Sequence, residues 1–200
     1  MSQMIDQPLT LQTFGDFQDE AIASSEYLTI VFSPSSFPLR ERWRTNRLSA
    51  TFLADYFSTF FPGEGQPADM IDPKSELMGV ITFITNELLE NAMKFSDATS
   101  NEPVMLTLQL YPNKLIFITK NQIDSSTEAQ LRGFIQELLA ADPTELYIQK
   151  IEQQAENEHA TSSGLGILTI VNDYAARIGW LFEAVEGAGA MVTTQVQLEI

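Results

Sequence analysis

Apolar residues recur at three- and four-residue steps between Asp72 and Asp97, and this spacing constrains the fold more than any other feature of the sequence. The stripe consists of Leu77, Ile81, Ile84, Leu88 and Phe95. Such spacing places the side chains on one face of an α-helix. Asp72 or Ser75 can cap the start of the helix, and Pro73 suits its first turn. We therefore predict a long amphipathic helix that ends near Ser96.

The rest of the chain alternates between short strand patterns and helical patterns. Strands are predicted at 27–32, 104–110, 115–119, 180–185 and 191–200, where β-branched residues and period-two alternation are frequent. Helices are predicted at 39–61, 125–158 with an interruption at Pro143, and 167–178. Hairpins and helices in this order predict an α+β fold, in which helices pack on one face of a mixed or antiparallel sheet.

Composition and charge narrow the class of protein. Hydrophobic residues make up 44% of the 200 residues, which is enough for a buried core, and there is no cysteine. The net charge of -16 argues against a nucleic-acid partner, because phosphate backbones require a positive field. No apolar run reaches the roughly 20 residues of a membrane span, and the N-terminus lacks signal-peptide features. We expect a cytoplasmic protein without a membrane partner.

The predicted helix at 72–97 carries a polar group of candidate catalytic residues in the segment NELLENAMKFS. Glu87 and Asn91 are four residues apart and share one helix face. An amide oxygen can ligate Mg²⁺, and a carboxylate can accept a proton from a hydroxyl group or water. Lys94 lies almost one turn further and can reach a phosphate. The alternative is an ordinary solvated helix face.

A second candidate site is the glycine-containing segment that precedes the helix at 167–178. Ser162 or Ser163 can cap this helix, and Gly164 and Gly166 allow the backbone to approach an anion closely. Free N–H groups at a helix start favour phosphate binding. A flexible capped loop is the alternative interpretation of Ser163, Gly164, Leu165 and Gly166.

The two segments together resemble the GHKL superfamily of ATPases and kinases. The segment ENAMKFS resembles the N-box of histidine kinases and anti-sigma-factor kinases, and SGLG resembles their second glycine box. The resemblance covers residues 72–200 and implies a two-layer α/β sandwich of the GHKL (Bergerat) type, with residues 1–71 as an N-terminal extension. It implies ATP and Mg²⁺ as cofactors, Glu87 as base, Asn91 as Mg²⁺ ligand, and a mobile lid at about 140–163.

One motif of this family is replaced in the chain. The family usually has an Asp-x-Gly-x-Gly loop after the second hairpin strand, and its Asp recognises the adenine amino group. This chain has TKNQIDSST, so Asn121 stands near the Asp position and both glycines are absent. An asparagine can still form a hydrogen bond with adenine, although with less charge assistance.

This departure is similar to SiaB-type protein kinases, which act on STAS-like proteins in bacterial partner-switching pathways. The resemblance implies a serine/threonine kinase with a STAS-like partner. The Arg-rich segment 40–57 resembles cyanobacterial proteins found beside such switches. The aromatic residues between Phe52 and Phe61 belong either to the core or to a homodimer interface. Two alternatives remain: a degenerate GHKL module that binds a partner without nucleotide, and a stand-alone ATPase.

Overall fold

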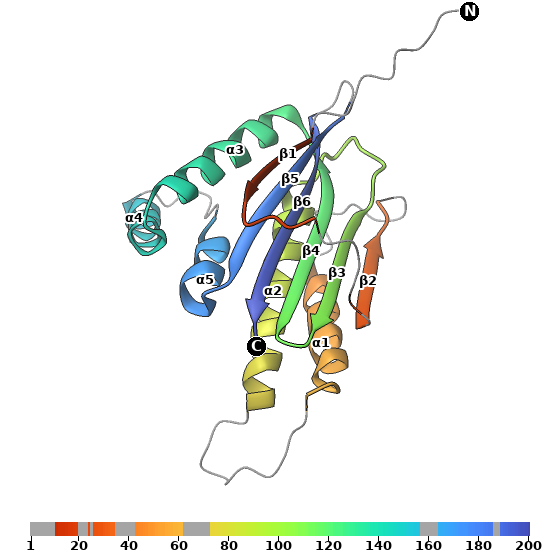
Figure 1. Ribbon diagram of the computed structural model, residues 1–200. Coiled ribbons are helices and arrows are strands. Elements are labelled where there is room, and N and C mark those ends of the chain that lie inside the picture. Colours follow the sequence, from red (N-terminus) through yellow and green to blue (C-terminus); the bar gives the residue numbers. More distant parts are fainter. Residues whose placement is uncertain are drawn as a thin grey trace, which may run out of the picture.

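The computed structural model describes residues 11–19, 24, 26–34, 43–61, 73–156, 164–185 and 189–200. These residues form six strands and five helices (Figure 1). In chain order they are β1 (Leu11–Gly15), β2 (Glu26–Phe32), α1 (Trp43–Ser58), α2 (Pro73–Phe95), β3 (Val104–Tyr111), β4 (Lys114–Ile123), α3 (Ser125–Ala140), α4 (Pro143–Glu156), α5 (Leu165–Tyr174), β5 (Arg177–Ala184) and β6 (Ala190–Glu199).

The strands form one six-stranded sheet in the order β1-β5-β6-β4-β3-β2, and every neighbouring pair is antiparallel. The two hairpins β3–β4 and β5–β6 lie side by side because β4 pairs with β6 along its whole length. Alternation on β6 directs Val192, Val196 and Leu198 into the core, as the sequence predicts. The sheet is therefore antiparallel rather than mixed.

Helices cover one face of this sheet (Figure 1). The stripe of α2 is the centre of the core: Ile81, Ile84 and Leu88 are fully buried against the sheet and against α1. The result is an α+β fold with a helical layer on an antiparallel sheet, which confirms the predicted α+β class with helices on one face of the sheet. No helix in the described ranges is both long and apolar enough to cross a membrane.

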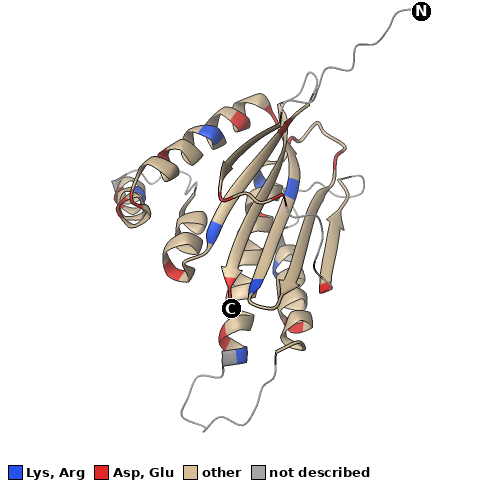
Figure 2. Cartoon of the chain, viewed as in Figure 1, with Lys and Arg blue, Asp and Glu red and all other residues tan. Residues whose placement is uncertain are grey.

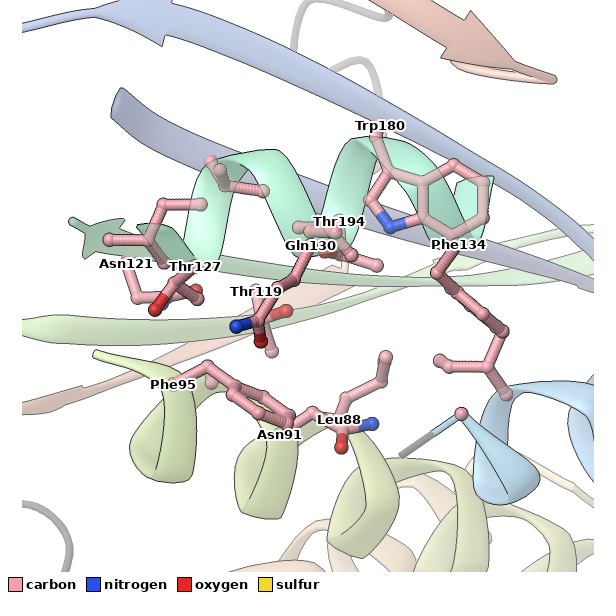
Figure 3. Close-up of a pocket in the computed structure, with 16 residues that line it drawn as sticks. Leu88, Asn91, Phe95, Thr119, Asn121, Thr127, Gln130, Phe134, Trp180 and Thr194 are labelled. Carbon is pink, nitrogen blue, oxygen red and sulfur yellow. The ribbon is translucent and has the colours of Figure 1, made fainter. Parts of the chain in front are cut away.

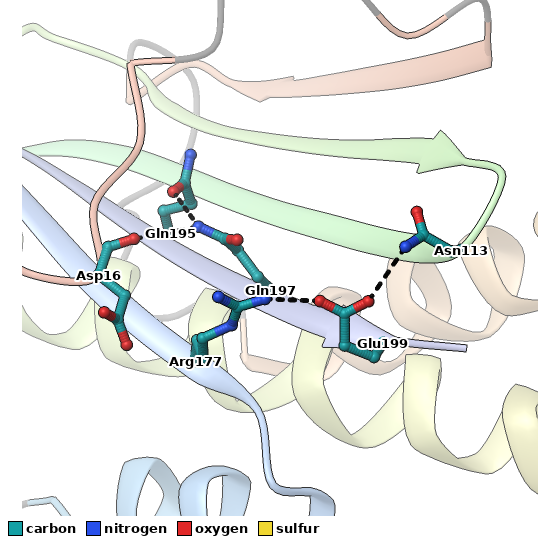
Figure 4. A network of polar contacts seen from close by, with 6 residues as sticks. All are labelled: Asp16, Asn113, Arg177, Gln195, Gln197 and Glu199. Carbon is teal, nitrogen blue, oxygen red and sulfur yellow. Dashed lines mark hydrogen bonds and ion pairs between the residues drawn. The ribbon is translucent and has the colours of Figure 1, made fainter.

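The opposite face of the sheet is crossed by the chain that follows β1 (Figure 4). The side-chain amide of Gln195 on β6 donates to the backbone carbonyl of Gln18 and accepts from its N–H, both at 3.0 Å. Gln197 donates to the carbonyl of Asp16 at 3.0 Å and to Oε1 of Gln195 at 2.9 Å. These bonds explain how two glutamines that the sequence places on the polar face become buried.

Several boundaries and exposures differ from the sequence prediction. Strand β4 continues to Ile123, because its pairing with β6 continues to Ala190 and overrides the polar composition of that segment. Helix α5 ends at Tyr174, because Ala175 adopts the left-handed conformation with φ 49°. On α1 the predicted apolar positions divide: Phe57 is buried, whereas Leu48 and Phe52 are 71% and 53% exposed.

Candidate functional site

A pocket lies between α2, α3, the start of α5 and the helical face of the sheet (Figure 3). Its cavity volume is about 100 Å³. The lining residues are Leu88, Asn91, Ala92, Phe95, Thr119, Asn121, Ile123, Thr127, Gln130, Leu131, Phe134, Gly164, Ile167, Trp180, Val192 and Thr194. None of them carries an ionisable side chain, so the pocket has an apolar wall with hydroxyl and carboxamide groups set into it.

The floor of the pocket is formed by residues that face one another across three strands. Thr194 on β6 is the register partner of both Thr119 on β4 and Trp180 on β5. Asn121 lies two residues further along β4, opposite Val192. Since alternate residues of a strand share a face, all five side chains point toward the helical layer. Trp180 is 2% exposed and forms the broad apolar part of the floor.

One wall is the face of α2 that carries Asn91. Leu88, Asn91, Ala92 and Phe95 are spaced so that they form one strip, which shares Leu88 and Phe95 with the apolar stripe of the helix. In Figure 3 the carboxamide of Asn91 lies between Leu88 and Phe95, below the floor residues. Asn91 is half-buried, and no hydrogen bond joins its side chain to another described residue.

The opposite wall is α3, which presents Thr127, Gln130 and Phe134 to the pocket. Its first turn is capped by Asp124, whose carboxylate accepts from the N–H of Thr127 at 2.8 Å. Its middle is attached to the sheet edge by Arg132, whose guanidinium lies 4.1 Å from the ring centroid of Phe182. The same guanidinium donates to Oε1 of Gln12 on β1 at 2.8 Å.

The chain enters α5 through Gly164, which has a φ of 98°. This conformation is unfavourable for residues with a side chain. A Cβ atom at Gly164 would also lie 2.5 Å from Cε2 of Phe134, so the ring of Phe134 covers the backbone of this turn. The turn therefore favours glycine for its backbone conformation, and the ring of Phe134 occupies the space beside that backbone. Ser163 lies outside the described residues.

Glu87 does not line the pocket but lies at the adjoining contact between α2 and α5. A Cβ atom on Gly166 would overlap its Oε2 atom, so only glycine allows this carboxylate to approach the first turn of α5. Burial raises the pKa of Glu87, and the nearby Glu90 carboxylate raises the same pKa further. No basic side chain among the described residues pairs with Glu87.

The structure thus brings part of the predicted site together. Asn91, Asn121 and Gly164 line one pocket, and Glu87 lies beside it at Gly166. Leu165 and Gly166 belong to the first turn of α5 and are outside the lining. Lys94 is also outside: its side chain is exposed, with Nζ 5.1 Å from the ring centroid of Phe95. Phosphate contact by Lys94 therefore requires a phosphate beyond the pocket itself.

Several lining residues were not predicted as site residues, chiefly Gln130, Phe134 and Trp180. Phe134 and Gln130 face the pocket only because α3 folds back over the sheet. No local sequence pattern predicts this packing. The strand pattern at 180–185 does not indicate that the ring of Trp180 borders a cavity.

The predicted lid includes α4, which is attached to its neighbours. Asn172 on α5 donates to the carbonyl of Pro143 at 3.1 Å, and its Oδ1 lies 3.1 Å from the hydroxyl of Thr144. Lys150 forms an ion pair with Glu137 of α3 at 2.8 Å. Residues 143–156 therefore form a docked helix. Residues 157–163, the remainder of the predicted lid, lie outside the described residues.

Charge is sparse around the site. In Figure 2 the basic residues appear at separate positions along the helices and strands of the described chain. Within the same residues, no group of three or more His, Cys, Asp or Glu side chains is placed to hold a metal ion.

Neither the models of protein families nor the curated protein sequences that were compared with this chain match it.

Proposed function

We propose that the pocket binds ATP and that the protein is a GHKL-type regulator, a serine/threonine kinase that acts on a STAS-like partner. One observation carries the proposal: Asn91 of α2 and Gly164 at the start of α5, far apart in sequence, border the same pocket. These are the two segments that resemble the N-box and the second glycine box. The docked α4 and the hairpins follow in the order that the resemblance implies.

In this proposal each group of residues would hold one part of the nucleotide. The cavity that Trp180 and Phe95 help to line would take the adenine ring, and Asn121 would face an edge of that ring. The N–H groups of the turn at Gly164–Gly166 would take the phosphates, as N–H groups at a helix start can do, and this requires the ring of Phe134 to move from its position beside Gly164. Glu87 adjoins that turn rather than the cavity proposed for adenine. A general base for phosphoryl transfer belongs beside the phosphates, so the position of Glu87 suits this role.

The donor set near the phosphates fits Mg²⁺ rather than a protein-enclosed metal. Asn91 offers one amide oxygen, and no carboxylate of the described residues lines the pocket. Mg²⁺ commonly keeps several waters and phosphate oxygens and needs few protein ligands. Asn91 would hold the ion, which when bound neutralises charge on the phosphates.

Binding of ATP is the first prediction. Calorimetric titration should show ATP binding that requires Mg²⁺ and that weakens about 10-fold or more in Asn91→Ala, because one amide ligand is lost. Asn86→Ala is the matched control: the same substitution on the same helix, but outside the pocket lining, should leave the affinity unchanged. Equal affinity of both variants would refute the role of Asn91.

Phosphoryl transfer is the second prediction. The γ-phosphoryl group would pass to a serine or threonine oxygen of the partner, the hydroxyl proton would pass to Glu87, and ADP would leave. Glu87→Gln should lower the rate by about 100-fold or more with ATP affinity retained. Glu90→Gln, a change of the neighbouring exposed carboxylate, should retain most of the rate.

The pH dependence of transfer follows from the pKa of Glu87. The carboxylate must be deprotonated to accept a proton, so the rate should fall as pH drops through a pKa above the usual value of about 4.3. Radiolabel transfer from ATP to purified STAS-like proteins, measured across pH, gives both results. A Glu87→Gln protein that transfers at the normal rate would remove Glu87 from the mechanism.

A second candidate is a GHKL-like module that binds a partner protein without nucleotide. It is favoured by the cavity volume of about 100 Å³, which is below the roughly 300–1,000 Å³ of common ligand pockets. The strand conformation of Asn121, in place of a glycine loop, favours it too. Absence of ATP binding at millimolar concentration, together with partner binding that is insensitive to Mg-ATP, would select this candidate.

A further inference from the structure

The side chain of Asn121 is the most deeply buried carboxamide in the pocket lining. It is 5% exposed and is held on β4, where pairing with β6 fixes its backbone opposite Val192. No hydrogen bond joins its side chain to another described residue. A buried amide that faces a cavity without a partner is expected to meet its hydrogen-bonding need through a ligand or water.

Because no hydrogen bond to a described residue fixes the carboxamide of Asn121, this group can adopt either of its two orientations. A carboxylate only accepts hydrogen bonds, so at this position it would favour the 6-amino group of adenine and repel the 6-oxo group of guanine or hypoxanthine. A carboxamide has both a donor and an acceptor. In one orientation Asn121 can accept from the amino group of adenine, and after a half-turn it can donate to a 6-oxo group and accept from the N1–H.

The other polar groups of the lining are also two-way groups, by which we mean that each can either donate or accept a hydrogen bond. Thr119, Thr127 and Thr194 carry hydroxyl groups, and Gln130 and Asn91 carry carboxamides. Each of these groups can donate or accept a hydrogen bond. Among the described residues, the lining has no carboxylate, guanidinium or ammonium group that would impose one direction. The apolar part, with Trp180 and Phe95, offers stacking surface that does not distinguish among purines.

We propose that this pocket binds 6-oxopurine nucleotides as well as adenine nucleotides, with Asn121 as the residue that permits both. This inference rests on the proposed nucleotide binding and extends it to a substrate class. It follows from the juxtaposition of an unpartnered buried amide with a lining that has only two-way polar groups. Phosphoryl donors for the protein would then include GTP as well as ATP.

The test is calorimetric titration of the full chain with Mg-ATP, Mg-ITP and Mg-GTP. Inosine differs from adenosine in presenting a 6-oxo group and an N1–H, whereas guanosine also adds a 2-amino group, so ITP isolates the effect. We expect dissociation constants for ATP and ITP within about fivefold of each other, because one hydrogen-bond pair replaces another. In Asn121→Asp, ITP should weaken by about 10- to 100-fold relative to ATP.

Two further variants keep the test decisive. Asn101→Asp adds the same charge at an exposed position outside the pocket and should leave the ATP to ITP ratio unchanged. If Asn121→Asp fails to fold, Asn121→Ser takes its place in the test. Serine also donates and accepts hydrogen bonds, so this variant should preserve the ATP to ITP ratio. ATP binding with ITP at least 100-fold weaker in the unaltered protein would overturn this inference alone. Binding of no nucleotide would overturn the proposed function and the inference with it.

Discussion

Gly179→Ala is expected to lower the free energy of unfolding by about 3–4 kcal/mol. The segment after β1 crosses strand β5 at this residue: Gly15 pairs with Gly179, and Gln18 is bonded to Gln195, the partner of Gly179 on β6. A Cβ atom on Gly179 would overlap the backbone N and Cα atoms of Phe17. Because the obstacle is backbone rather than a flexible side chain, the crossing segment itself must move.

Moving that segment breaks the bonds that bury two polar side chains. Gln195 would lose its pair of bonds to Gln18, and Gln197 its bond to Asp16 (Figure 4). Gly133→Ala is the matched control, because a Cβ atom there meets nothing within 4 Å in the interior of α3. It should stabilise the protein by about 0.5–1 kcal/mol. Urea unfolding compares both, and an unchanged midpoint for Gly179→Ala would contradict the crossing.

The parts of the fold that the sequence predicts are those with local periodicity. The stripe on α2 and the alternation on β6 depend on spacing within one segment. Their central apolar residues are buried as expected: Ile81, Ile84 and Leu88 on α2, and Val192, Val196 and Leu198 on β6. The end of β4 depends on a partner: Asn121 and Gln122 look like loop residues, yet pairing with β6 holds both in a strand. Tertiary pairing decides such boundaries, so a single sequence cannot locate them.

The candidate site was predicted to a similar extent. Asn91, Asn121 and Gly164 could be named because a motif resemblance singles them out, and all three line the pocket. Phe134 could not be named, because its place against Gly164 results from the way α3 packs over the sheet. The burial of Gln195 and Gln197 was equally hidden, since it depends on a crossing by residues some 180 positions earlier in the chain.

Trp180→Ala is expected to lower the free energy of unfolding by about 3–5 kcal/mol, the usual range for a fully buried aromatic residue. The substitution removes the apolar floor of the pocket and leaves a cavity that adjoins it. Phe52→Ala, which truncates an aromatic side chain that is 53% exposed, should cost below about 0.5 kcal/mol. Thermal unfolding that failed to separate these two variants would show that Trp180 is not part of the core.

Phe117→Ala separates the role of Trp180 in the core from its role in the pocket. Phe117 is fully buried on β4 but does not line the pocket, so its truncation should cost a similar amount of unfolding free energy. Indole should restore thermal stability to Trp180→Ala but not to Phe117→Ala. Only the cavity left by Trp180 has the shape of indole and is reached through the pocket.

If the pocket binds ATP, Trp180→Ala should also weaken that binding about 10-fold or more, through loss of the stacking surface. The Phe117→Ala protein should keep its affinity for ATP when it is measured below its unfolding transition. Phe117 contributes to stability but not to the floor of the pocket, so its loss should not affect binding.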